Sequence, residues 1–67
     1  MKLTVNGEKK NTDTKTVQKL LQSFDIEHGE KGVAVAVNDS VVPKDQWEDY
    51  QLEEEDRIEI IRATQGG

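Results

Sequence analysis

The chain has 67 residues and a formal net charge of −5, with no cysteine and one histidine. A chain of this length forms one domain with a modest core and leaves little room for a deep catalytic cleft. The lack of cysteine excludes disulfides, cysteine nucleophiles and Cys/His zinc sites. The acidic charge argues against nucleic acid as a partner, because phosphate binding needs a basic surface.

The charge is unevenly distributed along the chain. Residues 1–33 carry six lysines against five acidic residues, a net of +1, and residues 34–67 carry three basic against nine acidic residues, a net of −6. Such an acidic half would steer the protein toward basic partner proteins. The alternative interpretation is that the acidic residues only keep a small domain in solution.

Neither a membrane span nor a signal peptide is indicated. No apolar run approaches the length that crosses a bilayer. The N-terminus enters strand-like alternation at once, without the apolar region and cleavage site of a secretory signal. We therefore expect a cytoplasmic protein that does not bind membranes.

The N-terminal segment predicts a β-hairpin. Leu3 and Val5 alternate with polar residues over 1–5, and Asn6-Gly7 follows. Asn-Gly is the strongest short hairpin signal, because both central residues of a type I′ turn need a positive φ. Residues 8–11 should return as an antiparallel strand, and their polarity on both faces places this strand at a sheet edge.

One amphipathic helix is predicted next. Its apolar stripe repeats at helical spacing and consists of Val17, Leu20, Leu21 and Phe24. Thr16 is the expected N-cap, with Thr14 as the alternative. The polar stretch 25–31, which contains three acidic residues and Gly29, is expected to be a loop.

The clearest strand is 33–37, in which valine and alanine alternate. We expect the valines to face the helix, and Ala34 and Ala36 to leave the opposite face smooth. A turn at 38–40 and a short extended piece at 41–42 should follow. Pro43 suits the start of a helical turn over 44–48, and Trp47 and Leu52 should anchor this segment to the edge of the core.

The last strand is expected at 57–63, after an acidic turn at 53–56. Ile58 and Ile60 alternate inward, but Ile61 interrupts the alternation. Either a bulge returns Ile61 to the core, or it lies on the outer face beside Ala34 and Ala36. In the second case these three residues form a smooth apolar patch suited to docking a partner.

Motifs of enzyme sites are missing from the sequence. There is no P-loop, nucleophile elbow or glycine-rich dinucleotide turn. His28 lies in a polar stretch and is interpreted as an exposed loop residue. The acidic run Glu53–Asp56 is interpreted as a solvated turn and not as a metal site. We therefore expect a protein that is not an enzyme and has no metal of its own.

The C-terminal Gly66-Gly67 has a specific chemical use. Glycine has no Cβ, so a flexible tail over 64–67, including Gln65, can thread a narrow channel and carry the terminal carboxylate into a partner's active site. Adenylation would turn this poor electrophile into a mixed anhydride, and attack by a sulfur donor can then resolve to a thiocarboxylate on Gly67. Taken alone, the same residues also fit a frayed terminus.

Along its whole length the sequence resembles the ThiS family, the sulfur carriers of thiamine biosynthesis. The similarity is carried by Val5-Asn6-Gly7, Thr16-Val17 with Leu20-Leu21, Val35-Ala36-Val37-Asn38, Val42-Pro43 to Trp47, Asp56-Arg57-Ile58-Glu59-Ile60 and Gly66-Gly67. It implies an α+β, ubiquitin-like β-grasp fold over 1–67, with a mixed sheet packed on one helix. One departure is Glu55, where the family usually has glycine, so this turn is expected to be strained or built differently.

The resemblance also implies partners. A ThiF-like adenylyltransferase would activate Gly67 with its own ATP and Mg²⁺, and a cysteine desulfurase or sulfur relay protein would supply sulfur. A ThiG-like thiazole synthase would accept the sulfur during thiazole ring formation. The alternatives are a MoaD-like carrier for molybdopterin synthesis or a ubiquitin-like protein modifier, and, in another class, a non-catalytic ubiquitin-like interaction module with an inert tail.

Overall fold

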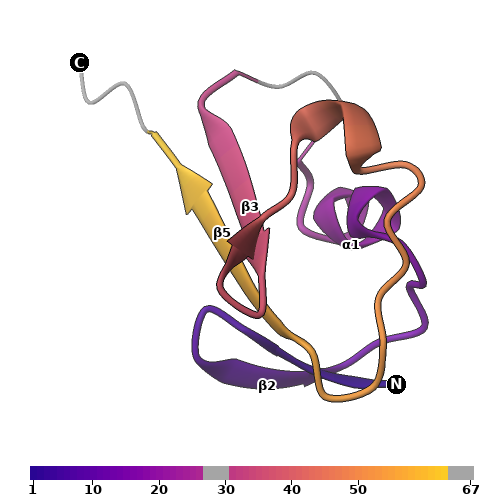
Figure 1. The fold of residues 1–67 in the computed structure, drawn as a ribbon. Helices are drawn as coiled ribbons and strands as arrows, with labels where there is room; N and C mark the ends of the chain where they lie inside the picture. Colours follow the sequence, from indigo (N-terminus) through magenta and orange to yellow (C-terminus); the bar gives the residue numbers. More distant parts are fainter. Residues whose placement is uncertain (27–30, 64–67) are drawn as a thin grey trace.

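Five strands form one mixed sheet that packs on a helix (Figure 1). The computed structural model describes residues 1–26 and 31–63. Within these residues the elements are β1 (Lys2–Val5), β2 (Glu8–Asn11), α1 (Val17–Ser23), β3 (Val33–Val37), β4 (Ser40–Val41), the 3₁₀ turn η1 (Lys44–Gln46) and β5 (Arg57–Arg62). The expected mixed sheet packed on one helix is confirmed.

The strand order is β2-β1-β5-β3-β4, so the last strand lies at the centre of the sheet. β5 runs parallel to β1 and antiparallel to β3, and the two outer pairs are antiparallel hairpins. β2 is an edge strand with every residue exposed, as its two-sided polarity predicted. The central position of β5 means that the strand leading to the C-terminus has a neighbour on each side.

Both hairpins close through two residues with positive φ. Asn6 and Gly7 have φ of 52° and 84°, and Asn38 and Asp39 have φ of 51° and 72°. These values fit the type I′ turn expected at the first hairpin. The second turn is shorter than the expected 38–40, since Ser40 already belongs to β4. Asn and Asp tolerate the left-handed conformation, so two residues are enough to reverse the chain there.

The helix begins where the sequence predicts. The Thr16 hydroxyl accepts a hydrogen bond from the backbone N–H of Lys19 at 3.2 Å, which satisfies a free donor of the first turn. The helix ends at Ser23, and Phe24, the last residue of the predicted stripe, lies beyond it as the C-cap, partly buried against the core.

The core fills the space between the sheet, α1 and the segment around η1. It contains Leu3, Val5, Val17, Leu20, Leu21, Ile26, Val35, Val37, Val42, Trp47, Leu52 and Ile58. Trp47 is fully buried, and its indole N–H donates to the Val42 carbonyl at 3.0 Å. Of the three valines expected to face the helix, Val33 is only partly buried. Ile26 belongs to the core although it lies in a stretch expected to be a polar loop. Its single apolar side chain has no periodic partner that would have indicated burial.

Candidate functional site: the last strand and its outer face

The predicted sulfur-attachment residue Gly67 and the threading residues Gly66 and Gln65 lie outside the described residues, as does His28. The site is therefore built from β5, which leads to them. Ala63 is the last described residue, and Gly67 follows four positions later. Four residues extend over at most about 14 Å, so any enzyme that reaches the terminal carboxylate must approach the end of β5 closely.

Ile61 lies on the outer face of the sheet, away from the helix, and 65% of it is exposed. The structure thereby decides between the two alternatives for this residue, because β5 continues without a bulge that would turn Ile61 inward. Its strand partner is Ala34, and the neighbouring pair across β3 and β5 is Ala36 with Glu59. Ile60, one position earlier, points to the opposite face and packs partly buried against the core.

A continuous apolar surface results, here called the outer patch: Ala34, Ala36, Ile61 and Val41. Val41 on β4 is paired with Ala36 and is 75% exposed. Val41 and Ile61 are the large hydrophobic side chains that stand exposed among the described residues. The patch spans three adjacent strands and borders the acidic Glu59. Exposed apolar side chains gathered in this way are typical of an interaction surface.

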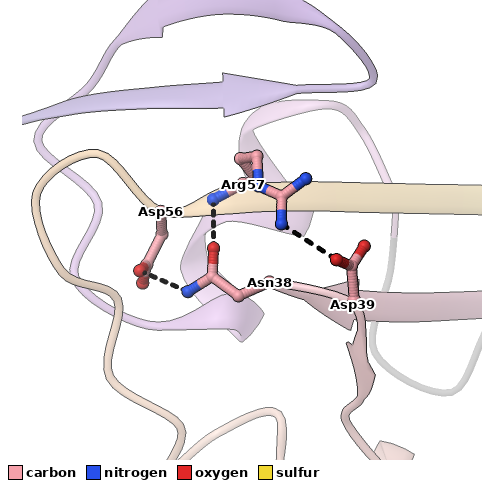
Figure 2. Close-up of polar contacts among 4 residues, drawn as sticks. All are labelled: Asn38, Asp39, Asp56 and Arg57. Carbon is pink, nitrogen blue, oxygen red and sulfur yellow. Dashed lines mark hydrogen bonds and ion pairs between the residues drawn. The ribbon is translucent and has the colours of Figure 1, made fainter.

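The start of β5 is held by a network of side chains (Figure 2). The Asn38 carboxamide accepts from the Arg57 backbone N–H at 2.9 Å and donates to Asp56 at 2.9 Å. The other Asp56 oxygen accepts from the Glu53 backbone N–H at 2.8 Å. Arg57 forms an exposed ion pair with Asp39 at 2.9 Å. These contacts join the β3–β4 turn to the acidic turn that precedes β5.

In the acidic turn, Glu55 adopts the left-handed conformation, with φ of 71°. Its backbone N–H donates to the Lys2 carbonyl at 2.7 Å, and so ties the turn to β1. The turn is therefore not rebuilt to suit glutamate: a residue with a Cβ occupies the conformation that glycine adopts most readily. Of the two expectations for this position, the strained one holds.

The end of β5 has a different support. On the β3 side, the Ala63 N–H donates to the Gly32 carbonyl at 2.6 Å. Gly32 has φ of 78°, and a Cβ there would lie 3.2 Å from the Ala63 carbonyl oxygen. On the β1 side, the main chain has already turned away at Asn6. The Asn6 side chain lies there instead: Oδ1 accepts from the Ile60 N–H at 2.8 Å and Nδ2 donates to the Ile60 carbonyl at 3.3 Å.

Sequence reasoning missed the roles of Asn6 and Asn38 beyond their turns, and the place of Val41 in the patch. An asparagine at the first position of each type I′ turn was the available signal, but glycine or aspartate meets the same φ requirement. Only the register of the sheet shows that each carboxamide reaches the backbone of β5. Val41 pairs with Ala36, which faces outward, so its own side chain also lies on the outer face of the sheet.

The rest of the described surface adds no catalytic constellation. Among residues 1–26 and 31–63 no group of three or more metal-ligating side chains converges, and no helix there is long and apolar enough to cross a membrane. An open groove runs beside α1 and the loop before it, with the buried Gln18 in its wall. The Gln18 Oε1 has no hydrogen-bond partner.

A mixed sheet of this order, packed on one helix and ending in a central strand that leads to Gly-Gly, defines a ubiquitin-like β-grasp carrier. The comparisons then specify the family. The ThiS family model matches residues 3–67. The chain is 36% identical to "Sulfur carrier protein ThiS" of Bacillus subtilis, over 97% of this chain and 98% of that protein. The Escherichia coli protein of the same name is 33% identical over 78% of this chain and 76% of its own length.

A solved structure agrees. The crystal structure of the thiamine biosynthesis protein ThiS from Geobacter metallireducens matches with a TM-score of 0.80 and 26% identity, covering the whole of both chains. The chain belongs to the ThiS family and is a sulfur carrier of thiamine biosynthesis. The family resemblance predicted from sequence is confirmed.

Proposed function

We propose that this protein carries sulfur as a thiocarboxylate on Gly67 and delivers it for formation of the thiazole ring of thiamine. The observation that supports this most directly is the family match, which runs through residue 67 and so includes Gly66-Gly67. The central place of β5 adds support, because the most firmly paired strand of the sheet leads to this tail.

The chemistry follows from the terminal carboxylate. Its charge repels nucleophiles, so it must first attack the α-phosphate of ATP, which forms an acyl adenylate and releases pyrophosphate. A donor persulfide then attacks the carbonyl and displaces AMP, which forms an acyl disulfide with Gly67. A thiol reductant cleaves its S–S bond, which leaves the thiocarboxylate on Gly67 and returns the donor as a thiol. Gly66 and Gln65 provide a slim approach into the activating site. The ATP and Mg²⁺ belong to a ThiF-like adenylyltransferase, and this chain holds no cofactor of its own.

The sulfur would come from a cysteine desulfurase or a relay protein, and a ThiG-like thiazole synthase would accept it. Delivery restores the carboxylate, so the carrier is a cosubstrate and not a catalyst. Since activation consumes ATP, the exchange is proposed to take place in the cytoplasm.

The outer patch is proposed as the docking surface for the activating enzyme. Ile61 precedes Gly67 by six residues, a reach of at most about 21 Å. An enzyme that takes the tail therefore comes within this distance of Ile61, which lies beside Ala34 and Ala36 on the sheet surface. The acidic Glu59 at the margin favours a partner surface that is apolar with a basic rim.

The first experiment measures intact mass after incubation with ATP, Mg²⁺, a ThiF-like enzyme and a sulfur source. Replacement of one carboxylate oxygen by sulfur should raise the mass by the difference between the two atoms. A chain lacking Gly67 and a chain with one residue added after it should stay unchanged in mass while remaining folded. Sulfur uptake by the extended chain would disprove the C-terminal mechanism.

Docking is tested separately with Ile61→Asp, which should stay folded because the side chain is exposed, yet bind the activating enzyme at least tenfold more weakly. Gln46→Glu adds the same charge on the exposed η1 turn and should bind normally. Equal binding by the two variants would remove the outer patch from the docking surface.

A further inference from the structure

The end of β5 carries an asparagine contact that the fold alone does not require. In the parallel pairing of β1 with β5, the register ends at Val5 with Ile58. The Thr4 and Asn6 backbone N–H groups donate to the carbonyls of Asp56 and Ile58, each at 2.9 Å. Alternate residues of β5 therefore direct their backbone groups toward β1, and Ile60 is the next in this series.

No β1 backbone reaches Ile60, because the chain reverses at Asn6-Gly7. The Asn6 carboxamide takes the place of the missing strand residue. Its Oδ1 meets the Ile60 N–H at 2.8 Å and its Nδ2 meets the Ile60 carbonyl at 3.3 Å. Because Ile60 offers both a donor N–H and an acceptor carbonyl, these two bonds determine the orientation of the Asn6 side-chain amide. One side chain thus extends the parallel pairing by one register position.

We propose that Asn6 is a positioning residue of the carrier: by holding Ile60 it fixes the end of β5, and with it the direction in which the chain leaves the sheet toward Gly67. This inference rests on the proposed function, since it concerns how the tail is presented to the activating enzyme. Ile61, which immediately follows the held residue, belongs to the outer patch. The Asn6–Ile60 contact therefore aligns the docking surface and the start of the tail together.

The matched variants are Asn6→Gly and Asn38→Gly. Both residues are the first of a type I′ turn, with φ of 52° and 51°, and both side chains bond to the β5 backbone. Glycine keeps each turn and removes each contact. Asn38 holds the start of β5 at Arg57, and Asn6 holds its end at Ile60. If both asparagines served stability alone, each variant would lose carrier function in proportion to its loss in free energy of unfolding. Which end of β5 the asparagine holds would then make no difference.

The first readout is amide hydrogen exchange in the full-length protein, with no enzyme present. Asn6→Gly should speed exchange at Ile60 by about five- to tenfold and leave Arg57 unchanged, because a single hydrogen bond controls local opening there. Asn38→Gly should speed exchange at Arg57 and leave Ile60 unchanged. Unchanged exchange at Ile60 in Asn6→Gly would overturn the structural part of the proposal.

The second readout is the rate of thiocarboxylate formation against carrier concentration, with a ThiF-like enzyme. Asn6→Gly should raise the KM for the carrier by about fivefold with kcat within twofold, because binding must then order the end of β5. Asn6→Asp keeps the turn and one acceptor oxygen, so its KM should lie between those of the unaltered protein and Asn6→Gly. Equal KM values for Asn6→Gly and Asn38→Gly would overturn the positioning role. If the unaltered chain takes up no sulfur, the proposed function fails, while the exchange result stands on its own.

Discussion

The two ends of β5 differ in how they are held. At its start, β5 pairs with β1 and β3 through main-chain bonds, and the Asn38 network joins the turns on both sides. Ile58, near this end, is fully buried. At its end, β3 supplies main-chain pairing on one side, and the Asn6 side chain bonds to Ile60 on the other. Ile61 there is exposed.

This difference assigns two roles to one strand: its start stabilises the fold, and its end exposes a surface to partners. The buried start contributes to the core, so its loss should unfold the domain. The end exposes Ile61 as part of the outer patch, and we propose that it directs the chain toward the tail. If several enzymes recognise the carrier in turn, as proposed above, it needs both a rigid base and an accessible end.

The largest expected effect comes from Ile58→Ala. Removing this buried side chain should lower the free energy of unfolding by about 3 kcal/mol, through lost transfer energy and the cavity left behind. The measurement is urea denaturation. The matched control is Ile61→Ala on the same strand, expected within about 0.5 kcal/mol of the unaltered protein because the side chain is already in water. Similar losses at both positions would contradict the division of β5 into two parts.

A smaller loss is expected for Asn38→Ala, about 2 kcal/mol. Two hydrogen bonds are removed, together worth about 1 kcal/mol at this exposed site. Alanine at φ of 51° adds about 1 kcal/mol of backbone strain. Asn38→Gly removes the same bonds without the strain, so denaturation of the two variants separates the terms. If the glycine variant is as unstable as the alanine variant, strain at this turn is negligible.

The smallest effect is a gain. Glu55→Gly should raise the free energy of unfolding by about 0.5–1 kcal/mol, because glycine adopts the left-handed conformation at φ of 71° without steric cost. Glu55→Ala keeps the Cβ and should bring no such gain, which distinguishes relief of strain from removal of an acidic charge. A gain in the alanine variant equal to that in glycine would assign the effect to charge.

Much of the architecture could be predicted because each signal is local. The alternation of Leu3 and Val5, the Asn6-Gly7 turn and the Thr16 cap depend on neighbours within a few residues, and all three are found in the structure. Trp47 anchors its segment to the core as expected, although it is fully buried and not at the edge of the core. Ile26 was missed, because a lone apolar residue between polar ones has no period from which burial can be inferred.

In the candidate site, too, some features could be predicted from sequence and others were decided only by the structure. Gly66-Gly67 can be proposed as the site from sequence, because the absence of side chains is a property of these residues themselves. Whether Ile61 faced the core or the outer face was left open, since the interrupted alternation fits both a bulge and an exposed position. The pairing of Ile61 with Ala34 decided it.

By itself, then, the sequence determined the order of elements, the hairpin turns, the helix start and the family. Only the tertiary structure decided that β5 lies between β1 and β3, and that Asn6 and Asn38 hold its two ends. The physical reason is range. Turns and amphipathic stripes arise from contacts close along the chain, whereas Asn6 meets Ile60 across 54 positions, through a register that only the assembled sheet defines.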